Sequence, residues 1–522
     1  MRVGIRLLAG FAALYAGSAW SIPEGPEYPS AEWTARDLAN VARSTEAPAE
    51  QLANPAFMMR WQMQSLANLL EWNARAAADP SWISAPSGNT PLAPLCATWG
   101  EQCAGDPFRY PQAPGADGAA FYTQEAEVIP VVFYDRGCAR ISGRVWAPRT
   151  GGNTLPGVII ENGSIQASEP LYWWAAQMLV RAGYVVMTFD PRGQGRSDLQ
   201  TPDGEQGGNF NPAVFWDGLV DAIDFFHSSS VQPYPHNLRC ADRYPTVVTA
   251  FNPHAARLDR ERLGLAGHSL GATGVSVVQA YGAEGAELWP GLLDAQNPVD
   301  VIVAWDRLGS DVVPRVPAMG QTSEYGFTPR PATEVPDPEE HKAAYRRWRD
   351  AGVPVFQFTI QIQGSSHFEW SLIPSFPATS WCADTTGDVC RGGWGQPMAA
   401  HYTLAWFDRW LKQPGEPGYA DADARLLADA DWHERYSFYR RSARAFADRS
   451  GRMHLCEDIR AGCTDEMTAA GGGSGGGVFT GWALAVLVLL RWRRMLLRAG
   501  LRQPRHAHAD LVGTGEVLQH QG

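Results

Sequence analysis

The stretch LGLAGHSLGATG, at Leu263–Gly274, holds the pattern G-x-S-x-G centred on Ser269. This pattern is typical of a nucleophile elbow, a sharp strand-to-helix turn in which flanking glycines leave room for a strained serine. An apolar segment, RLGLAG, precedes Ser269, and a helical pattern follows it. The same pattern recurs around Ser474 in GGGSGGG, where neither element surrounds it. The sequence therefore predicts that Ser269 is a nucleophile at a helix N-terminus, where backbone N–H groups favour an oxyanion.

The elements around this elbow alternate between short apolar strands and amphipathic segments from about residue 126 to residue 412. Such alternation predicts an α/β fold with a mostly parallel central sheet and helices on both faces. With the elbow and the strand-and-turn AGYVVMTFDPRGQGRSD at 182–198, this region resembles the α/β-hydrolase family. The resemblance implies the α/β-hydrolase fold and a serine hydrolase. It also implies that an acid and then a histidine follow the serine along the chain.

The loop after the third strand supplies one oxyanion-hole N–H in that family. Where relatives often have His-Gly, this chain has Asn162-Gly163 in IIENGS, and a backbone donor does not depend on the preceding side chain. We expect the oxyanion hole to be formed by the N–H groups of Ser164 and Leu270, with Ile165 as the fallback for the first. The alternative for this loop is an ordinary strand-end turn, because Asn-Gly is a general turn signal.

In the α/β-hydrolase order, the acid and the base follow Ser269 along the chain. Five histidines lie between the serine and the glycine-rich linker: His341, His367, His401, His433 and His454. Only His367, in IQGSSHFEWS, follows a strongly apolar final strand in a loop, so we expect it to be the base. Glu324, at the end of RVPAMGQTSEYG, is separated from that loop by one helix and is the expected acid. Asp306, one strand earlier, and Asp311 are the alternatives.

Many α/β-hydrolases have a cap domain, inserted at this point of the chain, that covers the active site. Here little sequence separates Trp305 from Arg315, so any cap domain is small or absent and another segment must cover the site. The candidates are the N-terminal region and the segment 228–261. Trp173 and Phe368 are expected to bind substrate in an apolar pocket, although aromatic clusters near a sheet also form cores.

The two ends of the chain predict export. The start MRVGIRLLAGFAALYAGSAW has basic, apolar and small-residue regions in the order of a signal peptide. The end GGGSGGGVFTGWALAVLVLLRWRR combines a flexible linker, an apolar run and three arginines. It resembles the GlyGly-CTERM sorting signal, which implies processing by a rhombosortase, an intramembrane protease. A permanent membrane anchor on an exported protein is the alternative, although the apolar run is shorter than about 20 residues.

These observations predict six segments. They are a signal peptide at 1–21, an N-terminal helical extension at 22–125, the α/β-hydrolase domain at 126–463, a Gly-rich linker at 464–477, a transmembrane or sorting segment with its arginine cluster at 478–494, and a C-terminal tail at 495–522.

Cysteine usage also favours an oxidising compartment. Eight cysteines are present, and six fall in close pairs: Cys96 with Cys103, Cys382 with Cys390, and Cys456 with Cys463. Cys138 and Cys240 remain to close a long loop, and no spacing is C-x-x-C, which disfavours zinc ribbons and thioredoxin chemistry.

The composition argues against one class of function, nucleic-acid binding, because the 522-residue chain has a formal net charge of −12. A Ser-acid-His triad needs neither a cofactor nor a metal, so none is expected, and RGQGRSD lacks the third glycine of a dinucleotide fingerprint. The sequence predicts an exported, periplasmic or cell-surface serine hydrolase that cleaves small carboxylic esters through an acyl-enzyme. The alternatives are an amidase or peptidase with the same triad, and a surface binding protein without turnover.

Overall fold

The computed structural model describes residues 26–39, 41, 55, 77, 121–152, 154–164, 169–195, 197–243, 248–324, 326, 333–361, 367–371 and 395–463. All of them belong to the first of the two units into which the chain divides, Met1–Thr468. The expected signal peptide, linker, sorting segment and tail lie outside the described residues. So do Cys96, Cys103, Cys382, Cys390 and most of the N-terminal extension, of which a helix over residues 31–39 is described.

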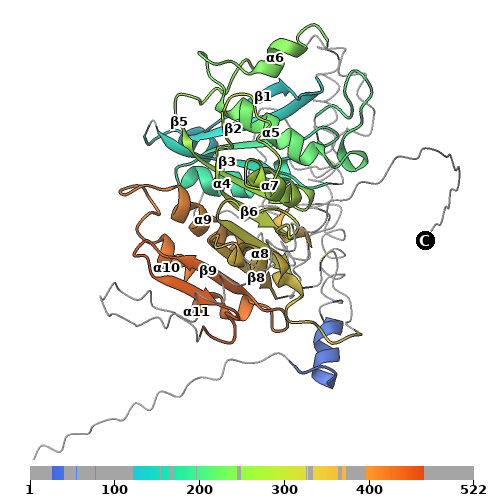
Figure 1. Ribbon diagram of the computed structural model, residues 1–522, viewed down its shortest axis with the longest axis vertical. Coiled ribbons are helices and arrows are strands. Elements are labelled where there is room, and N and C mark those ends of the chain that lie inside the picture. Colours follow the sequence, from blue (N-terminus) through green and yellow to red (C-terminus); the bar gives the residue numbers. More distant parts are fainter. Residues whose placement is uncertain are drawn as a thin grey trace, which may run out of the picture. The chain divides into compact units, whose positions relative to one another are not determined.

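The described residues form one sheet of ten strands (Figure 1). In spatial order the strands are β1 (Ala126–Tyr134), β2 (Arg140–Pro148), β4 (Val185–Asp190), β3 (Leu155–Glu161), β5 (Leu258–His268), β6 (Val299–Trp305), β7 (Ala318–Ser323), β8 (Val355–Ile360), β9 (Ala443–Ala447) and β10 (Met453–Cys456). The strands from β4 to β8 pair in parallel, whereas β1, β2, β9 and β10 pair in antiparallel fashion with their neighbours. The expected α/β architecture with a mostly parallel central sheet is therefore confirmed.

Helices cover both faces of this sheet. Helices α4 (Trp173–Arg181) and α9 (Gln396–Leu411) share one apolar core, while α5 (Val214–His227), α7 (Leu270–Ala280) and α8 (Ala343–Asp350) share the other. Successive side chains of a strand point to opposite faces. In β3, accordingly, Val158 and Ile160 belong to the α4 core and Ile159 to the α5 core. Because both faces are covered, the central strands are almost continuously buried.

The C-terminal part of the domain extends the sheet. The sequence predicts only a proline- and aspartate-rich wrap after residue 413, but β9 pairs with β8 and β10 pairs with β9. Helices α10 (Ala422–Leu426) and α11 (Asp429–Trp432) precede these strands. The two strands contain only five and four residues, too few for an alternating pattern to stand out. The expected disulfide between Cys456 and Cys463 closes this segment and is confirmed.

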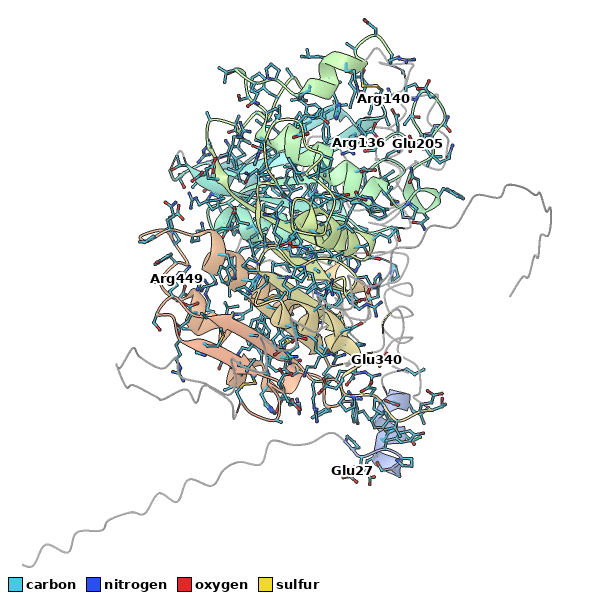
Figure 2. The ribbon with its side chains drawn as sticks, in the orientation of Figure 1. Glu27, Arg136, Arg140, Glu205, Glu340 and Arg449 are labelled. Atoms are coloured by element: carbon cyan, nitrogen blue, oxygen red, sulfur yellow. A yellow bond between two sulfur atoms is a disulfide. The ribbon has the colours of Figure 1, made fainter. Side chains whose placement is uncertain are left out.

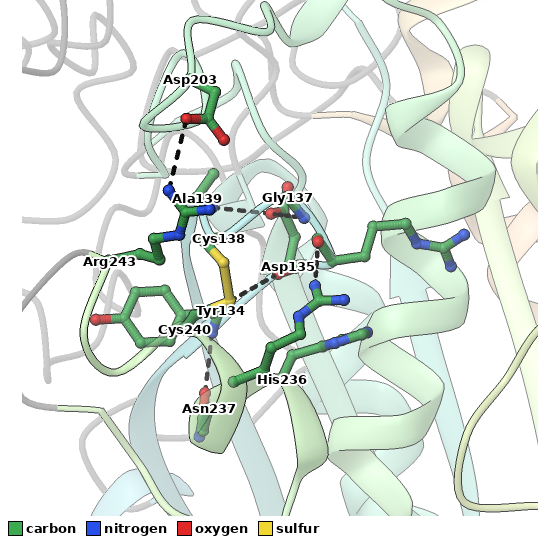
Figure 3. The surroundings of a disulfide bond; sticks show 12 residues. Tyr134, Asp135, Gly137, Cys138, Ala139, Asp203, His236, Asn237, Cys240 and Arg243 are labelled. Carbon is green, nitrogen blue, oxygen red and sulfur yellow. Dashed lines mark hydrogen bonds and ion pairs between the residues drawn. A yellow bond between two sulfur atoms is a disulfide. The ribbon is translucent and has the colours of Figure 1, made fainter.

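The long-range disulfide expected from the sequence is also present. It joins Cys138, in the turn between β1 and β2, to Cys240 at the end of α6 (Pro235–Cys240), with 5.3 Å between the Cα atoms (Figure 3). The amide oxygen of Asn237 accepts the N–H of Tyr134 at 3.0 Å. The segment 228–261 is thus attached to the β1 edge of the sheet.

Removing the disulfide between Cys138 and Cys240 is expected to destabilise the domain more than removing the disulfide between Cys456 and Cys463. The first closes a sequence separation of 102 residues and the second a separation of 7. The chain-entropy relation gives about 2 kcal/mol more loss for the longer loop. Denaturant unfolding of the two Cys→Ala double variants measures the difference. A larger loss for the short loop would contradict this account.

The turn after β4 is held by a buried ion pair. Asp198 accepts the backbone N–H and the guanidinium of Arg140, with 2.7 Å between Arg140 Nη2 and Asp198 Oδ1. Figure 2 labels Arg140, with Arg136 and Glu205, near the β1 end of the sheet. RGQGRSD is therefore a structural turn, anchored by the fully buried Arg140.

No helix in the described part of the chain is both long enough and apolar enough to cross a membrane. The predicted membrane or sorting segment at 478–494 lies outside that part and stays a prediction.

Candidate active site

Ser269 occupies the turn between β5 and α7. Its backbone has φ 58° and ψ −117°, a conformation that residues other than glycine rarely adopt. Its N–H donates to the carbonyl oxygen of Trp305 at 3.0 Å, which fixes the turn against β6. Such strain costs about 1–3 kcal/mol and is concentrated at functional sites. The strand-turn-helix predicted for Ser269 is confirmed.

The glycines of the elbow are required by close approach of the backbone. A Cβ atom at Gly271 would lie 2.6 Å from the carbonyl oxygens of both Glu161 and Asn162. A Cβ atom at Gly267 would meet the carbonyl oxygen of Gly271. The first turn of α7 therefore packs directly on the end of β5 and on the loop after β3, as the elbow pattern predicts.

His367 forms a hydrogen bond through Nδ1 to Asp306 Oδ2. The backbone N–H of His367 donates to the carbonyl oxygen of Gly326 at 2.7 Å. The backbone N–H of Asp306 donates to the carbonyl oxygen of Gln321 at 2.8 Å. Burial alone would raise the pKa of Asp306, but the hydrogen bond from His367 and the charge that His367 carries when protonated outweigh it, so the pKa lies below its usual value. Asp306 is thus held as a carboxylate that orients the imidazole.

Asp306 replaces Glu324 as the candidate acid. Asp306 directly follows β6, the strand beside β5, and the sheet register pairs Trp305 with His268, so Asp306 and Ser269 are adjacent at one sheet edge. Asp306 also has a positive φ, 47°. Ser269 and Asp306 are two of the three residues other than glycine with positive φ in the described ranges.

Glu324, the acid expected from sequence, has different partners. Its Oε2 accepts Arg36 Nη2 at 2.7 Å, and its Oε1 accepts the Ser437 hydroxyl at 2.5 Å. It directly follows β7, which lies one strand further from the nucleophile than β6. The carboxylate therefore anchors the N-terminal helix over residues 31–39, and the assignment of Glu324 as the acid is corrected.

A cavity of about 690 Å³ brings the three catalytic candidates together: Ser269, Asp306 and His367 all line it. The remaining described lining mixes polar and apolar side chains and comes from Leu270, Thr273, Ser276, Val277, Arg307, Leu308, Gly309, Ser310, Asp311, Val312, Thr322, Ser323, Gly326 and His341. A concave site of this size fits a small molecule. Asp311, the other alternative acid, is exposed at this cavity, and Ser310 donates a 3.4 Å hydrogen bond to it.

Of the two expected oxyanion donors, Leu270 borders the cavity, and Ser164 follows Gly163, which lies beside Ser269. Leu270 lines the cavity and is the first residue of α7, where N–H groups have no partner within the helix. A Cβ atom at Gly163 would lie 3.2 Å from Ser269 Cβ, so the loop after β3 runs beside the nucleophile. Ser164, the next residue, is half-buried and is not among the described lining residues. Ile165, the fallback, lies outside the described residues.

The carboxyl group at the end of β3 lies just before this loop. Glu161 is fully buried, and burial, followed by the charge of Asp190, raises its pKa well above the usual value. This environment disfavours a negative charge on Glu161.

Trp173 is a core residue rather than a substrate contact. Its side chain is 2% exposed and belongs to the apolar core of α4, with the Arg144 guanidinium 4.5 Å from the ring centroid. The expectation that it binds substrate is corrected, because its helix turns this face toward the sheet. The side chain of Phe368 lies outside the described residues.

Neither of the two segments expected to cover the site lines the described cavity: no residue of the helix over residues 31–39 and none of the segment 228–261 is among its described lining. Besides the Arg36 contact, the ring of Trp33 lies 4.0 Å from that of Tyr439. Arg36 of the helix over residues 31–39 binds Glu324, and Gly326, two residues later, accepts the N–H of His367. The helix therefore packs close to the segment that carries His367.

Three residues near the site received no catalytic or positioning role from the sequence: Tyr172, His268 and His341. His341 lines the cavity, and its Nδ1 is 3.3 Å and 3.2 Å from the hydroxyls of Thr322 and Thr359. Burial, followed by the charge of Arg440, lowers the pKa of His341, so it is neutral near pH 7. The sequence placed it inside a charged helix, whereas it lies in a short 3₁₀ turn, Glu340–Lys342.

No group of three or more His, Cys, Asp or Glu side chains among the described residues is arranged to hold a metal ion. No protein-family model matches this chain, and the comparison with curated proteins found no match.

Proposed function

We propose that this chain is a serine hydrolase of the α/β-hydrolase type that cleaves carboxylic esters through an acyl-enzyme. Ser269 is the nucleophile, His367 the general base and Asp306 the acid that orients it. The reaction requires no cofactor. The observation that carries the proposal is the presence, in one cavity, of a strained serine at a helix N-terminus and a carboxylate-bound histidine.

The residues have distinct roles in this reaction. Ser269 Oγ attacks the ester carbonyl carbon while His367 Nε2 accepts the hydroxyl proton. Asp306 Oδ2 accepts the Nδ1–H of His367 and stabilises the cation that forms. The N–H groups of Leu270 and Ser164 donate to the oxyanion. His367 then protonates the departing alcohol, and a water molecule, activated by the same histidine, cleaves the acyl-enzyme.

Turnover of nitrophenyl esters with acyl chains of two to eight carbons, compared with the matching nitroanilides, tests the proposal. Polar side chains form part of the mixed cavity lining, among them Thr273, Ser276 and Thr322, and burying them against a long alkyl chain is costly, which favours short or hydroxylated acyl groups. We expect ester turnover that declines with chain length. Preferential anilide cleavage would favour the amidase alternative, and no turnover of either series would favour a binding protein.

The proposal of export depends on both ends of the chain, and it includes association with the membrane through residues 478–494 and processing by a rhombosortase-type protease. A processed protein is expected to end within or near AAGGGSGGG, because a glycine-rich sequence has low helix propensity and is where an intramembrane protease can unwind the chain. Intact-mass analysis of the natively exported protein measures this. Finding residues 495–522 still attached would instead favour the permanent anchor.

A further inference from the structure

His268, the residue before the nucleophile, is buried and hydrogen-bonded through both ring nitrogens. Its Nε2 lies 2.7 Å from the carbonyl oxygen of His367, and its Nδ1 lies 2.8 Å from the hydroxyl of Tyr172. The Tyr172 hydroxyl oxygen is in turn 3.1 Å from the backbone nitrogen of Gly163. Through His268, the last residue of β5, these contacts join the loop after β3 to the segment that carries His367.

The direction of each hydrogen bond follows from chemistry. A carbonyl oxygen only accepts, so Nε2 of His268 carries the proton. Burial, followed by the positive charge of His367, lowers the pKa of His268 to about 3, so the ring is neutral and Nδ1 is an acceptor. The Tyr172 hydroxyl therefore donates to Nδ1, and its oxygen accepts the N–H of Gly163. Every bond in the series has one possible direction.

Aromatic neighbours restrict movement of these two side chains. The Tyr172 and Trp305 rings are nearly parallel, at 5° and 6.4 Å between centroids. The His268 ring lies 6.1 Å from that of Trp370 and 4.7 Å from that of His367. Both Tyr172 and His268 are at most 1% exposed, so water does not compete for their hydrogen bonds.

We propose that Tyr172 and His268 are positioning residues that fix the oxyanion loop and the general-base loop relative to Ser269. This inference rests on the proposed hydrolase function. The Tyr172 contact also indicates which N–H of the loop after β3 is the oxyanion donor. Because the Tyr172 hydroxyl accepts the single N–H of Gly163, the next N–H along the loop is that of Ser164. Misplacement by about 1 Å in such a site costs about 100-fold in rate.

Tyr172→Phe tests the proposal, because it removes the hydroxyl and keeps the ring. We expect kcat for ester hydrolysis to fall about 10- to 100-fold, with KM within about twofold of wild type because Tyr172 is outside the described cavity lining. Tyr402→Phe is the matched control: Tyr402 is also buried and its hydroxyl bonds that of Tyr436 at 2.6 Å. Equal losses of Tm in the two variants, with kcat unchanged in both, would overturn the positioning role.

Two substitutions of His268 separate its contacts. Gln places an amide N–H where Nε2 lies and keeps the donor to the His367 carbonyl, whereas Leu removes both polar groups. We expect His268→Gln to retain several-fold more kcat than His268→Leu at equal KM. Equal kcat in the two variants would overturn the role of the His367 contact.

A nitrogen-proton correlation spectrum of the imidazoles tests the network without using activity. The His268 signals, identified by their loss in His268→Gln, are expected to report a neutral ring with its proton on Nε2 at pH 7. A proton on Nδ1 would overturn the proposal even if the protein hydrolyses esters. Conversely, if the wild type turns over no ester but the Nε2 proton is present, the hydrolase proposal fails and the network is retained as a structural feature.

Discussion

Ser269→Ala is expected to lower kcat for ester hydrolysis by about 10⁶-fold, the scale seen when a nucleophilic serine is removed from a triad. The nucleophile contributes one oxygen atom, and alanine keeps the Cβ atom in the same strained turn. The fold should therefore persist, and we expect Tm within a few degrees of wild type. The remaining rate comes from the oxyanion donors and from substrate binding.

Ser474→Ala is the matched control for this variant, because Ser474 lies in the other G-x-S-x-G pattern of the chain. Wild-type turnover is expected for it, since no strand-turn-helix pattern surrounds that serine. Initial-rate kinetics on a short nitrophenyl ester measure both variants. Ester turnover that survives in Ser269→Ala at near the wild-type rate would require a different nucleophile.

Asp306→Asn is expected to lower kcat by about 10⁴-fold, the second largest effect, with little change in the fold. An asparagine amide does not supply the negative charge that Asp306 provides, and it can bind the wrong tautomer of His367. Because the pKa of Asp306 lies below its usual value, wild type keeps this charge throughout the neutral range. Its contribution to stability is present above the unfolded-state pKa, about 3.9, and is lost as the pH falls through the lower folded-state value.

Glu324→Gln provides the comparison that separates the two carboxylates. Glu324 binds Arg36 and Ser437, so its loss should lower Tm while kcat changes less than about tenfold. Initial rates and thermal unfolding of both variants distinguish these effects. If Glu324→Gln were the crippling change and Asp306→Asn the mild one, the acid assignment would be reversed.

The elbow and the position of the candidate base, His367, were predictable because each depends on local sequence. Gly267, Ser269 and Gly271 stand within five residues, between an apolar strand and a helix. His367 is the histidine that follows the last parallel strand, β8, and it faces the cavity as expected. The central sheet was predictable for the same reason, since its buried strands are long apolar runs.

The acid was not predictable from local sequence. Both β6 and β7 are followed by a carboxylate, Asp306 and Glu324, and chain order alone does not choose between them. The choice depends on β6 pairing beside β5, and on Arg36, nearly three hundred residues before Glu324, reaching that carboxylate. Such tertiary contacts leave no periodic pattern. The expected substrate contact of Trp173 failed for a similar reason. Aromatic residues at the start of a helix can line a pocket or pack on the sheet, and their composition does not tell which; here Trp173 packs on the sheet.

The network through Tyr172 and His268 was likewise hidden from sequence. His268 was visible only as the variable residue within G-x-S-x-G, and Tyr172 only as one of three aromatic residues at the start of a helix. Their hydrogen bonds join β5 to two loops that are distant along the chain.

Covalent labelling with a fluorophosphonate, followed by peptide mapping, tests the central claim most directly. The reagent phosphonylates a serine only when a base and an oxyanion hole activate it. One adduct is expected on the wild-type protein, on Ser269, with none on Ser269→Ala and slow labelling of Asp306→Asn. An adduct on another residue, or equal labelling of wild type and Ser269→Ala, would contradict the assignment of Ser269 as the nucleophile.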